Sequence, residues 1–182
     1  MRKRSLSNFK PEQFEQRKFF WRVRTWSWTI VNRSIFSSLL CTSKVRSALL
    51  RFWGADIGLD LTIRAGVKIY FPWNLKIGDN CWIGEEVWFI NHEKISIGSN
   101  VCISQRSIIC SSGHNYRSES LEYDHEPIRI SDGAWICLDA KVLPGVTIGE
   151  CSVVSAGEIV RKSLPNYSIL IGGHIHRIDP PR

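Results

Sequence analysis

The chain has 182 residues, 43% of them hydrophobic, which suffices for one domain with an appendage, and its formal net charge is +7 at pH 7. That charge belongs to residues 1–53, which carry 12 Lys and Arg against 2 Asp and Glu, whereas residues 54–182 carry 12 against 15. A repeat protein of the solenoid type that bound nucleic acid would be expected to carry basic residues along its body, so no nucleic-acid partner is expected.

The six cysteines show neither a Cys-X-X-Cys pair nor zinc-ligand spacing, which favours small buried thiols in a reducing compartment over a disulfide framework. The start Met1-Arg2-Lys3-Arg4 is basic, but no clean apolar run with a small-residue cleavage site follows it. No signal peptide is therefore expected, and the predicted location is the cytoplasm.

Residues 1–54 are predicted to form a basic, aromatic, helical N-terminal segment. Apolar side chains recur at helical spacing at positions 19, 23, 26 and 30, and again at 28, 31, 35 and 39. Asn32 and Arg33 interrupt this stretch, so it is not expected to span a bilayer. We hypothesise instead that residues 17–40 make peripheral contact with an anionic inner membrane face, with packing around an oligomer as the alternative.

A second helix is predicted over residues 44–53, with Ser43 as its N-cap and Gly54 as its stop signal. Its expected apolar face contains Val45, Leu49 and Phe52. We expect this helix to cover the open end of the repeat structure that follows, which would otherwise expose strand edges.

An aliphatic or aromatic residue then recurs at every sixth position in five triplets. These are Ile57, Ile63, Ile69; Ile77, Ile83, Phe89; Ile97, Ile103, Ile109; Ile130, Ile136, Val142; and Ile148, Val154, Val160. A hexapeptide repeat of this kind is typical of a β-solenoid. The sequence therefore predicts an all-β solenoid of about five triangular coils over residues 55–162. A β-sandwich is the alternative, but it does not explain fifteen positions at one spacing.

Three hexads make one coil of about 18 residues, and each short strand pairs with the strand one coil above, roughly 4.8 Å away. Five of the repeat positions are followed directly by Gly, which we expect at corners because Gly adopts backbone angles that a Cβ forbids. A single coil cannot bury its apolar side chains, so at least three must stack.

Two kinds of insertion interrupt the repeat. The steps from Ile57 to Ile77 and from Ile77 to Ile97 are 20 residues rather than 18, so residues 72–74 and 91–93 are expected to bulge at a corner. Between Ile109 and Ile130 the repeat is absent, which predicts an excursion loop over residues 111–127. Residues 163–182 follow the repeat as a C-terminal tail.

His114 lies at the root of the loop and is the strongest catalytic candidate, because loops on a rigid scaffold carry function and an imidazole suits a general base. A surface histidine without a role is the alternative. His92, at a bulge, could line the same cleft, whereas His125 is expected to be a solvated partner of the acidic residues around it. These three histidines also leave open a zinc site of the hydrase type.

Several stretches together resemble the colanic-acid-type polysaccharide O-acetyltransferases of the left-handed β-helix, hexapeptide-repeat acyltransferases. They are Phe71-Pro72-Trp73, residues 77–84 and 97–105, Ser112-Gly113-His114-Asn115-Tyr116, residues 132–136 and residues 143–149. The resemblance covers nearly the whole chain. It implies a left-handed β-helix that assembles as a homotrimer and binds acetyl-CoA between neighbouring solenoids. The acetyl group would pass directly to a sugar hydroxyl, with no metal.

The resemblance also assigns residue roles. His114 falls on the family's catalytic base, and the wall of the pantetheine passage falls on Trp135, Cys137, Leu138 and Ala156. Arg161 and Lys162 fall near the nucleotide end of the cofactor, where Arg177 adds a further basic residue. The residues expected to contact the acceptor are Gly84, Asn91, His92, Asn115 and Tyr116.

Three departures from the family pattern limit these assignments. The tail reads Gly172-Gly173-His174-Ile175-His176-Arg177 instead of a Gly-Asn-Pro-Ala run with a basic residue, Cys137 replaces a glycine, and Gly84 and His92 replace the acceptor-binding Asn and Asp of galactoside enzymes. The acceptor that the resemblance implies is an exopolysaccharide or another surface-glycan precursor, whether free, nucleotide-linked or lipid-linked. A xenobiotic or small free sugar, a zinc hydrase and a non-catalytic solenoid are the alternatives.

Overall fold

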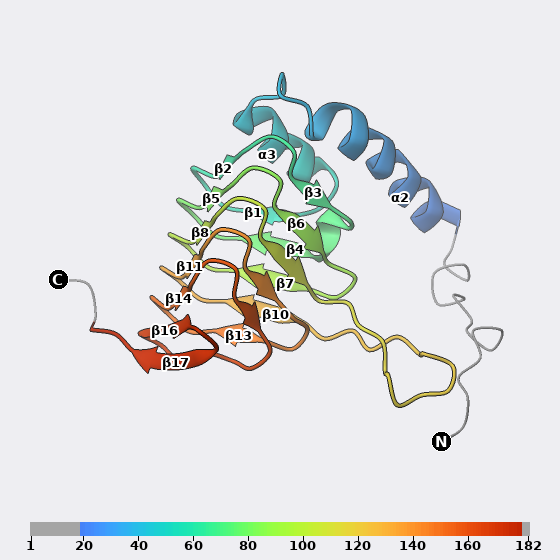
Figure 1. Cartoon of the computed structure of the whole chain (residues 1–182). Helices are drawn as coiled ribbons and strands as arrows, with labels where there is room; N and C mark the ends of the chain where they lie inside the picture. Colours follow the sequence, from blue (N-terminus) through green and yellow to red (C-terminus); the bar gives the residue numbers. More distant parts are fainter. Residues whose placement is uncertain (1–18, 180–182) are drawn as a thin grey trace.

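The computed structural model describes residues 19–179 and shows three sheets that form the faces of a triangular solenoid (Figure 1). Successive strands visit the first, second and third sheet in turn, so three strands make one coil. Five complete coils are followed by one more parallel strand in the second sheet. The predicted all-β solenoid is therefore confirmed. Residues 1–18 of the predicted N-terminal segment and residues 180–182 of the tail lie outside the described residues.

The strands are short and regularly spaced. The first sheet contains β1 (Asp56–Ile57), β4 (Leu75–Ile77), β7 (Ile95–Ile97), β10 (Ile128–Ile130) and β13 (Thr147–Ile148). The second contains β2 (Thr62–Ile63), β5 (Trp82–Ile83), β8 (Cys102–Ile103), β11 (Trp135–Ile136), β14 (Val153–Val154), β16 (Ser168–Ile171) and β17 (His174–Arg177). The third contains β3 (Lys68–Ile69), β6 (Trp88–Ile90), β9 (Ile108–Cys110), β12 (Lys141–Val142) and β15 (Ile159–Val160).

The core is a set of stacked columns of repeat residues. Ile83 of β5 lies opposite Ile63 of one neighbouring strand and Ile103 of the other, and all three are buried. Side chains alternate across a strand, so the residue before each of these points outward. Each fully buried Ile contributes about 1.5–3 kcal/mol, and the columns run through the whole stack.

The glycines that follow repeat residues have a different role from the one predicted. The φ angles of Gly78 and Gly98 lie outside the left-handed region, which is adopted instead by the third residue after the repeat position, as at Asn80 (φ 54°) and Asn100 (φ 58°). A Cβ on Gly78 would lie 2.7 Å from the carbonyl carbon of Gly98 in the next coil. Glycine is therefore needed there because two coils approach closely, not because of its backbone angles.

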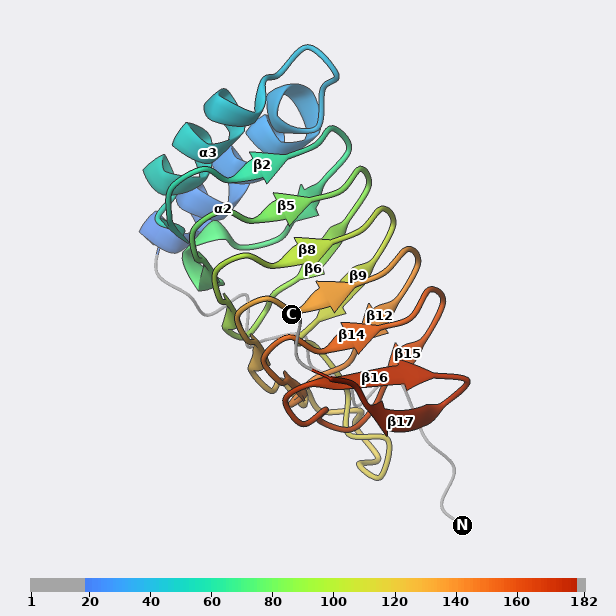
Figure 2. The same cartoon turned by 90° about the vertical axis from the view of Figure 1, so that its left-hand side faces the viewer.

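Three helical elements cover the first coil: α2 (Phe19–Val31), the π-helix η2 (Asn32–Phe36) and α3 (Ser43–Phe52) (Figures 1 and 2). Trp28 Nε1 and Asn32 Nδ2 both donate to the Ile69 carbonyl, at 2.8 and 3.0 Å, and Ser43 Oγ accepts from Ile63 N at 2.8 Å. These bonds satisfy backbone groups at the exposed edge of the stack. The N-cap of α3 is Thr42 rather than the predicted Ser43, because Ser43 is used in this contact.

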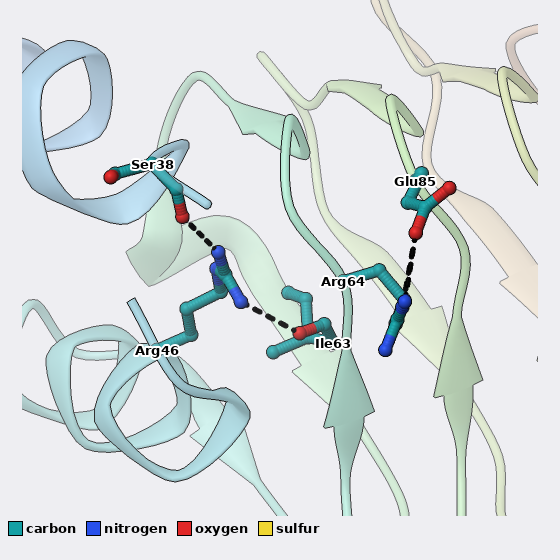
Figure 3. A network of polar contacts seen from close by, with 5 residues as sticks. All are labelled: Ser38, Arg46, Ile63, Arg64 and Glu85. Atoms are coloured by element: carbon teal, nitrogen blue, oxygen red, sulfur yellow. Dashed lines mark hydrogen bonds and ion pairs between the residues drawn. The ribbon is translucent and has the colours of Figure 1, made fainter. Parts of the chain in front are cut away.

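Of the three residues predicted for the apolar face of α3, Leu49 packs against the core and the other two do not. Val45 and Phe52 are exposed, whereas Leu50 and Arg46 are buried, Arg46 with only 3% of its surface exposed. The Arg46 guanidinium donates to the carbonyl oxygens of Ser38 and Ile63 (Figure 3) and to the carbonyl oxygen of Phe36. Burial lowers the pKa of Arg46, but a guanidinium stays charged at neutral pH. One cation thus ties η2, the following turn and β2 together.

The insertions lie where they were predicted, and all of them follow strands of the third sheet. The first contains the 3₁₀ helix η3 (Pro72–Asn74), and the second is held by Asn74 Nδ2, which donates to the His92 carbonyl at 2.8 Å. The loop of residues 111–127 leaves after β9, returns at β10 and protrudes from the stack (yellow in Figure 1). At the opposite end from the helices, β16 and β17 form an antiparallel hairpin, so strand stacking continues beyond residue 162.

We predict that Arg46→Met lowers the free energy of unfolding by about 2–4 kcal/mol, because three carbonyl oxygens lose a charged donor in a site that water does not reach. Urea denaturation followed by circular dichroism measures this change. Arg64→Met is the control, since the Arg64–Glu85 ion pair (2.9 Å, Figure 3) is exposed and should contribute less than about 1 kcal/mol. Equal midpoints for the two variants would contradict the anchoring role of Arg46.

Candidate functional site

The predicted site residues gather at two corners of the triangle. We call the passage from the second to the third sheet the second corner, and the passage from the third sheet to the next coil the third corner. Gly84, Cys137, Leu138 and Ala156 lie at the second corner, with Trp135 just before it on β11. The third corner holds the remaining predicted residues except Arg177, namely Asn91, His92, His114, Asn115, Tyr116, Arg161 and Lys162. In one copy of the chain the third sheet separates these two groups.

The loop that carries His114 is built of two antiparallel arms. His114 pairs with Tyr123 in a β-bridge, Asn115 N donates to the Glu122 carbonyl at 2.8 Å, and Asp124 N donates to the Gly113 carbonyl at 2.9 Å. His114 is exposed at the third corner, and Asn115 and Tyr116 follow it along the outgoing arm, also exposed.

A backbone carbonyl sets the tautomer of His114. His114 Nδ1 lies 2.7 Å from the carbonyl oxygen of Leu121. A carbonyl oxygen can only accept a hydrogen bond, so Nδ1 carries the proton and the lone pair of the neutral ring lies on Nε2. Imidazole Nε2 in this form can take a proton from a hydroxyl, which is the chemistry of a general base.

A column of four rings, which we call the ring column, continues from His114 into the solenoid. The centroids of His114 and Tyr123 are 4.8 Å apart, those of Tyr123 and His125 are 5.0 Å apart, and the rings of His125 and His92 stack at 5.2 Å with an interplanar angle of 12°. The prediction that His125 is a solvated partner of acidic residues is therefore wrong. Its ring is packed between Tyr123 and His92.

Sequence reasoning missed Tyr123, although a signal for it was present. Residues 121–126 read Leu-Glu-Tyr-Asp-His-Glu, and the structure buries part of each odd position while the even positions are exposed. Such alternation indicates an extended strand with one packed face. The three acidic side chains conceal the pattern because they suggest a solvated loop.

Two of the predicted acceptor contacts conflict with the structure. The side chain of Asn91 is completely buried: its Oδ1 accepts from the backbone N–H groups of Tyr70 and Phe71, and its Nδ2 donates to the Phe71 carbonyl. Gly84 is also buried, and a Cβ there would lie 2.7 Å from Gln105 N of the next coil. Asn91 therefore holds the bulge in place, and Gly84 allows two coils to approach. Neither residue is accessible to an acceptor.

The second corner borders a groove of about 560 Å³ that extends over several coils. Its lining includes Ala65, Glu85, Arg106 and Leu138. Trp135 beside it is half-exposed and donates from Nε1 to Ser104 Oγ at 2.9 Å. Burial raises the pKa of the Cys137 thiol, which therefore stays protonated at neutral pH. A thiol in that form is a poor nucleophile, so Cys137 can form part of a wall but is not suited to carry an acyl group.

A second hollow of about 410 Å³ lies at the C-terminal end of the stack. Arg161 and Lys162 are both exposed there and line it together with Leu170 and Ile175. Arg177 is exposed on β17, opposite Ser168 of β16. The basic residues predicted for the nucleotide end of the cofactor thus lie at one end of the molecule.

Two further properties concern the described part of the chain. Within residues 19–179, no three His, Cys, Asp or Glu side chains are grouped so that they could hold a metal ion. In the same range, no helix combines the length and the apolar character needed to cross a membrane.

The architecture is that of known acetyltransferases, although no family model matches the chain. A hexapeptide-repeat acetyltransferase of Vibrio cholerae, solved in complex with acetyl coenzyme A, superimposes with a TM-score of 0.78 and is 25% identical over 87% of either chain. A triangular solenoid with a histidine-bearing loop between coils thus defines a hexapeptide-repeat acyltransferase with the left-handed β-helix expected from the sequence.

The sequence comparisons identify the family more narrowly. The WcaF protein of Escherichia coli K12, whose name gives it an acetyltransferase role in colanic acid biosynthesis, is 39% identical over 144 residues, 79% of either chain. The chain belongs to this WcaF-like family of hexapeptide-repeat acetyltransferases. The galactoside O-acetyltransferase of the same organism is 29% identical over 130 residues, which are 70% of this chain and 64% of that protein.

Proposed function

We propose that this protein transfers an acetyl group from acetyl-CoA to a sugar hydroxyl of an exopolysaccharide or another surface-glycan precursor. The observation that carries the proposal is the hydrogen bond between His114 Nδ1 and the Leu121 carbonyl, which leaves Nε2 as the unprotonated nitrogen of an exposed imidazole at the third corner. The complex of the Vibrio relative supports acetyl-CoA as the donor, and the name of WcaF supports a glycan acceptor.

In the proposed reaction, His114 Nε2 removes the proton of the acceptor hydroxyl while the hydroxyl oxygen attacks the thioester carbonyl. The C–S bond then breaks, the acetyl group stays on the acceptor oxygen, and the imidazolium returns its proton to the departing thiolate. Backbone N–H groups of the cleft stabilise the oxyanion, and holding both substrates together supplies much of the rate. Asn115, Tyr116 and His92 border the acceptor.

The donor site in this proposal is shared between two copies of the chain. His114 lies at the third corner, whereas Trp135, Cys137, Leu138 and Ala156 lie on the other side of the third sheet. A second copy that places its second corner against this third corner completes the site, and a homotrimer closes such an arrangement. Arg161, Lys162 and Arg177 then contact the phosphates of the cofactor through charge-assisted hydrogen bonds.

We predict that His114→Ala lowers the rate of acetyl transfer by about 10²–10⁴, the usual contribution of a general base. Release of CoA thiol is measured with acetyl-CoA and free, nucleotide-linked and polyprenyl-diphosphate-linked hexoses. His174→Ala on β17, which removes an exposed histidine outside both corners, should keep the rate of the unaltered protein. A loss of less than tenfold in His114→Ala would count against the assigned role.

The shared site predicts complementation between two inactive variants. Ala156→Trp adds bulk at the exposed second corner, and His114→Ala removes the base at the third. Trimers mixed in equal amounts should recover about a quarter of the full activity, because one interface in four then joins two intact corners. Light scattering reports the oligomeric state. A monomer, or mixed trimers no more active than the parent variants, would refute the shared site.

The proposal extends to contact with a membrane surface, where the acceptor would be found. Its basis is that α2 has two apolar faces. Trp21 and Trp28 face the solenoid, with the ring of Trp28 buried. A stripe at helical spacing faces solvent instead: Phe19 is 73% exposed, Trp26 74% and Ile30 55%. Residues 19–54 contain six Lys and Arg and no Asp or Glu. An apolar stripe among cations matches the interface of an anionic bilayer, where lipid-linked precursors are held at the cytoplasmic face.

We predict that the protein sediments with vesicles of phosphatidylcholine and phosphatidylglycerol, less so in high salt, and not with phosphatidylcholine alone. Phe19→Ser combined with Trp26→Ser should weaken this binding at least about tenfold, since two interfacial rings are lost. Ile171→Ser, at the opposite end of the stack, is the control for loss of an exposed apolar side chain. Unchanged vesicle binding together with a changed oligomeric state of the double variant would instead assign the stripe to contacts between copies of the chain.

A further inference from the structure

We propose that Tyr123 is a positioning residue for the catalytic histidine, and that it acts through the ring column anchored in the second coil. The inference rests on the proposed role of His114 as the base. It assigns a function to a residue that is among neither the residues proposed to hold the donor nor those proposed to contact the acceptor. Its basis is the sequence of contacts His114–Tyr123–His125–His92.

Two contacts fix the imidazole of His114 in different ways. The hydrogen bond to Leu121 O sets which nitrogen carries the proton, but by itself it allows the ring to swing about the Nδ1···O axis. The ring of Tyr123, tilted by 33° at 4.8 Å, covers one side of the imidazole and limits this swing. Both partners come from the returning arm of the loop. The direction of Nε2 therefore depends on where that arm lies.

The returning arm is in turn tied to the solenoid through His125. Its ring stacks on His92, and His92 packs edge-on against the buried Phe71 at 5.2 Å. The backbone of His92 is fixed by Asn74, and the backbone of Phe71 is fixed by the buried side chain of Asn91. The foot of the column is thus part of the rigid second coil. The two bulges, which are not needed for stacking of the coils, thus serve to support the ring column.

The column is needed because the loop is long and consists of only two paired arms. A two-stranded ribbon is marginally stable in water unless a third element packs against it. The ring column is such an element, and it packs at the end of the loop where the base lies. A displacement of about 1 Å at a catalytic group can cost on the order of a hundredfold in rate, so anchoring of this kind affects turnover more than folding.

The test compares two substitutions at position 123 in the full-length protein. Tyr123→Phe keeps the ring and should retain kcat within about twofold, whereas Tyr123→Leu should lower kcat about ten- to a hundredfold. The KM for acetyl-CoA should change by less than about twofold in both, because Tyr123 is not among the residues proposed to hold the donor. Tyr167→Leu, the same change near the C-terminal end of the stack, is the matched control and should keep both constants.

The acceptor in these assays is the fastest sugar of the panel used for His114→Ala, or water where no sugar reacts. Equal kcat values for Tyr123→Leu and the unaltered protein would overturn the inference. So would an equal loss in Tyr123→Phe, since the hydroxyl rather than the ring contact would then be responsible. A loss in Tyr123→Leu that came with a lower thermal midpoint and a raised KM would also overturn it, because that pattern indicates general unfolding.

A second readout needs no acceptor and so separates this inference from the proposed function. Long-range ¹H–¹⁵N NMR distinguishes the protonated from the unprotonated nitrogen of each imidazole, and the His114→Ala spectrum identifies the signals of His114. We expect an Nδ1-protonated ring in all three proteins, but broadened His114 ring signals in Tyr123→Leu alone, because the imidazole can then swing about the Nδ1···O axis. An unchanged His114 signal in Tyr123→Leu would refute the positioning role even if the protein acetylates no sugar. The expected change would support that role even then.

Discussion

The close stacking of one coil on the next is the constraint on which the rest of this structure depends. Repeat residues such as Ile83 and Ile103 lie directly over one another, and glycines such as Gly78 allow the backbones between them to approach. The rise from coil to coil is fixed by backbone hydrogen bonds, so no sheet face can accept an extra residue. Added length must leave the chain at a corner. Within the coils of residues 55–162 it does so at the third corner each time.

The placement of the insertions explains how a long loop can hold the proposed base, His114. Three consecutive passages at the third corner contain added residues: the first includes η3, the second includes Asn91 and His92, and the third is the loop of residues 111–127. Because the coils stack in register, the three insertions are also neighbours in space. The two short ones provide buried backbone contacts and a ring on which the long one rests. The scaffold thus extends locally, at the corner where the proposed base lies.

The sequence predicted the parts of the fold that follow from the six-residue spacing of apolar side chains. It left open the parts that depend on tertiary contacts of individual side chains. Spacing by six located the coils, the bulges and the loop, because each repeat position corresponds to one inward side chain. The same reasoning failed for α3, where the cation of Arg46 rather than Val45 is buried, since only tertiary carbonyls make that burial favourable. It also failed for Asn91, because a polar residue in an insertion can hold the backbone or a ligand equally well.

The helical end of the stack combines positive charge with the exposed apolar stripe of α2, and a trimer would bring three such surfaces together. Corners that meet along their length align the three solenoids side by side, so all three α2 helices lie at the same end. Residues 19–54 of each copy contribute positive charges without a single acidic residue. Three linked contacts with one bilayer bind far more strongly than a single contact. Once the first helix is bound, the second and third bind intramolecularly and lose little further translational and rotational entropy. The arrangement that completes the donor site would therefore also gather the exposed stripes of α2 into one membrane-facing surface, with the loop of His114 extending beside the stack.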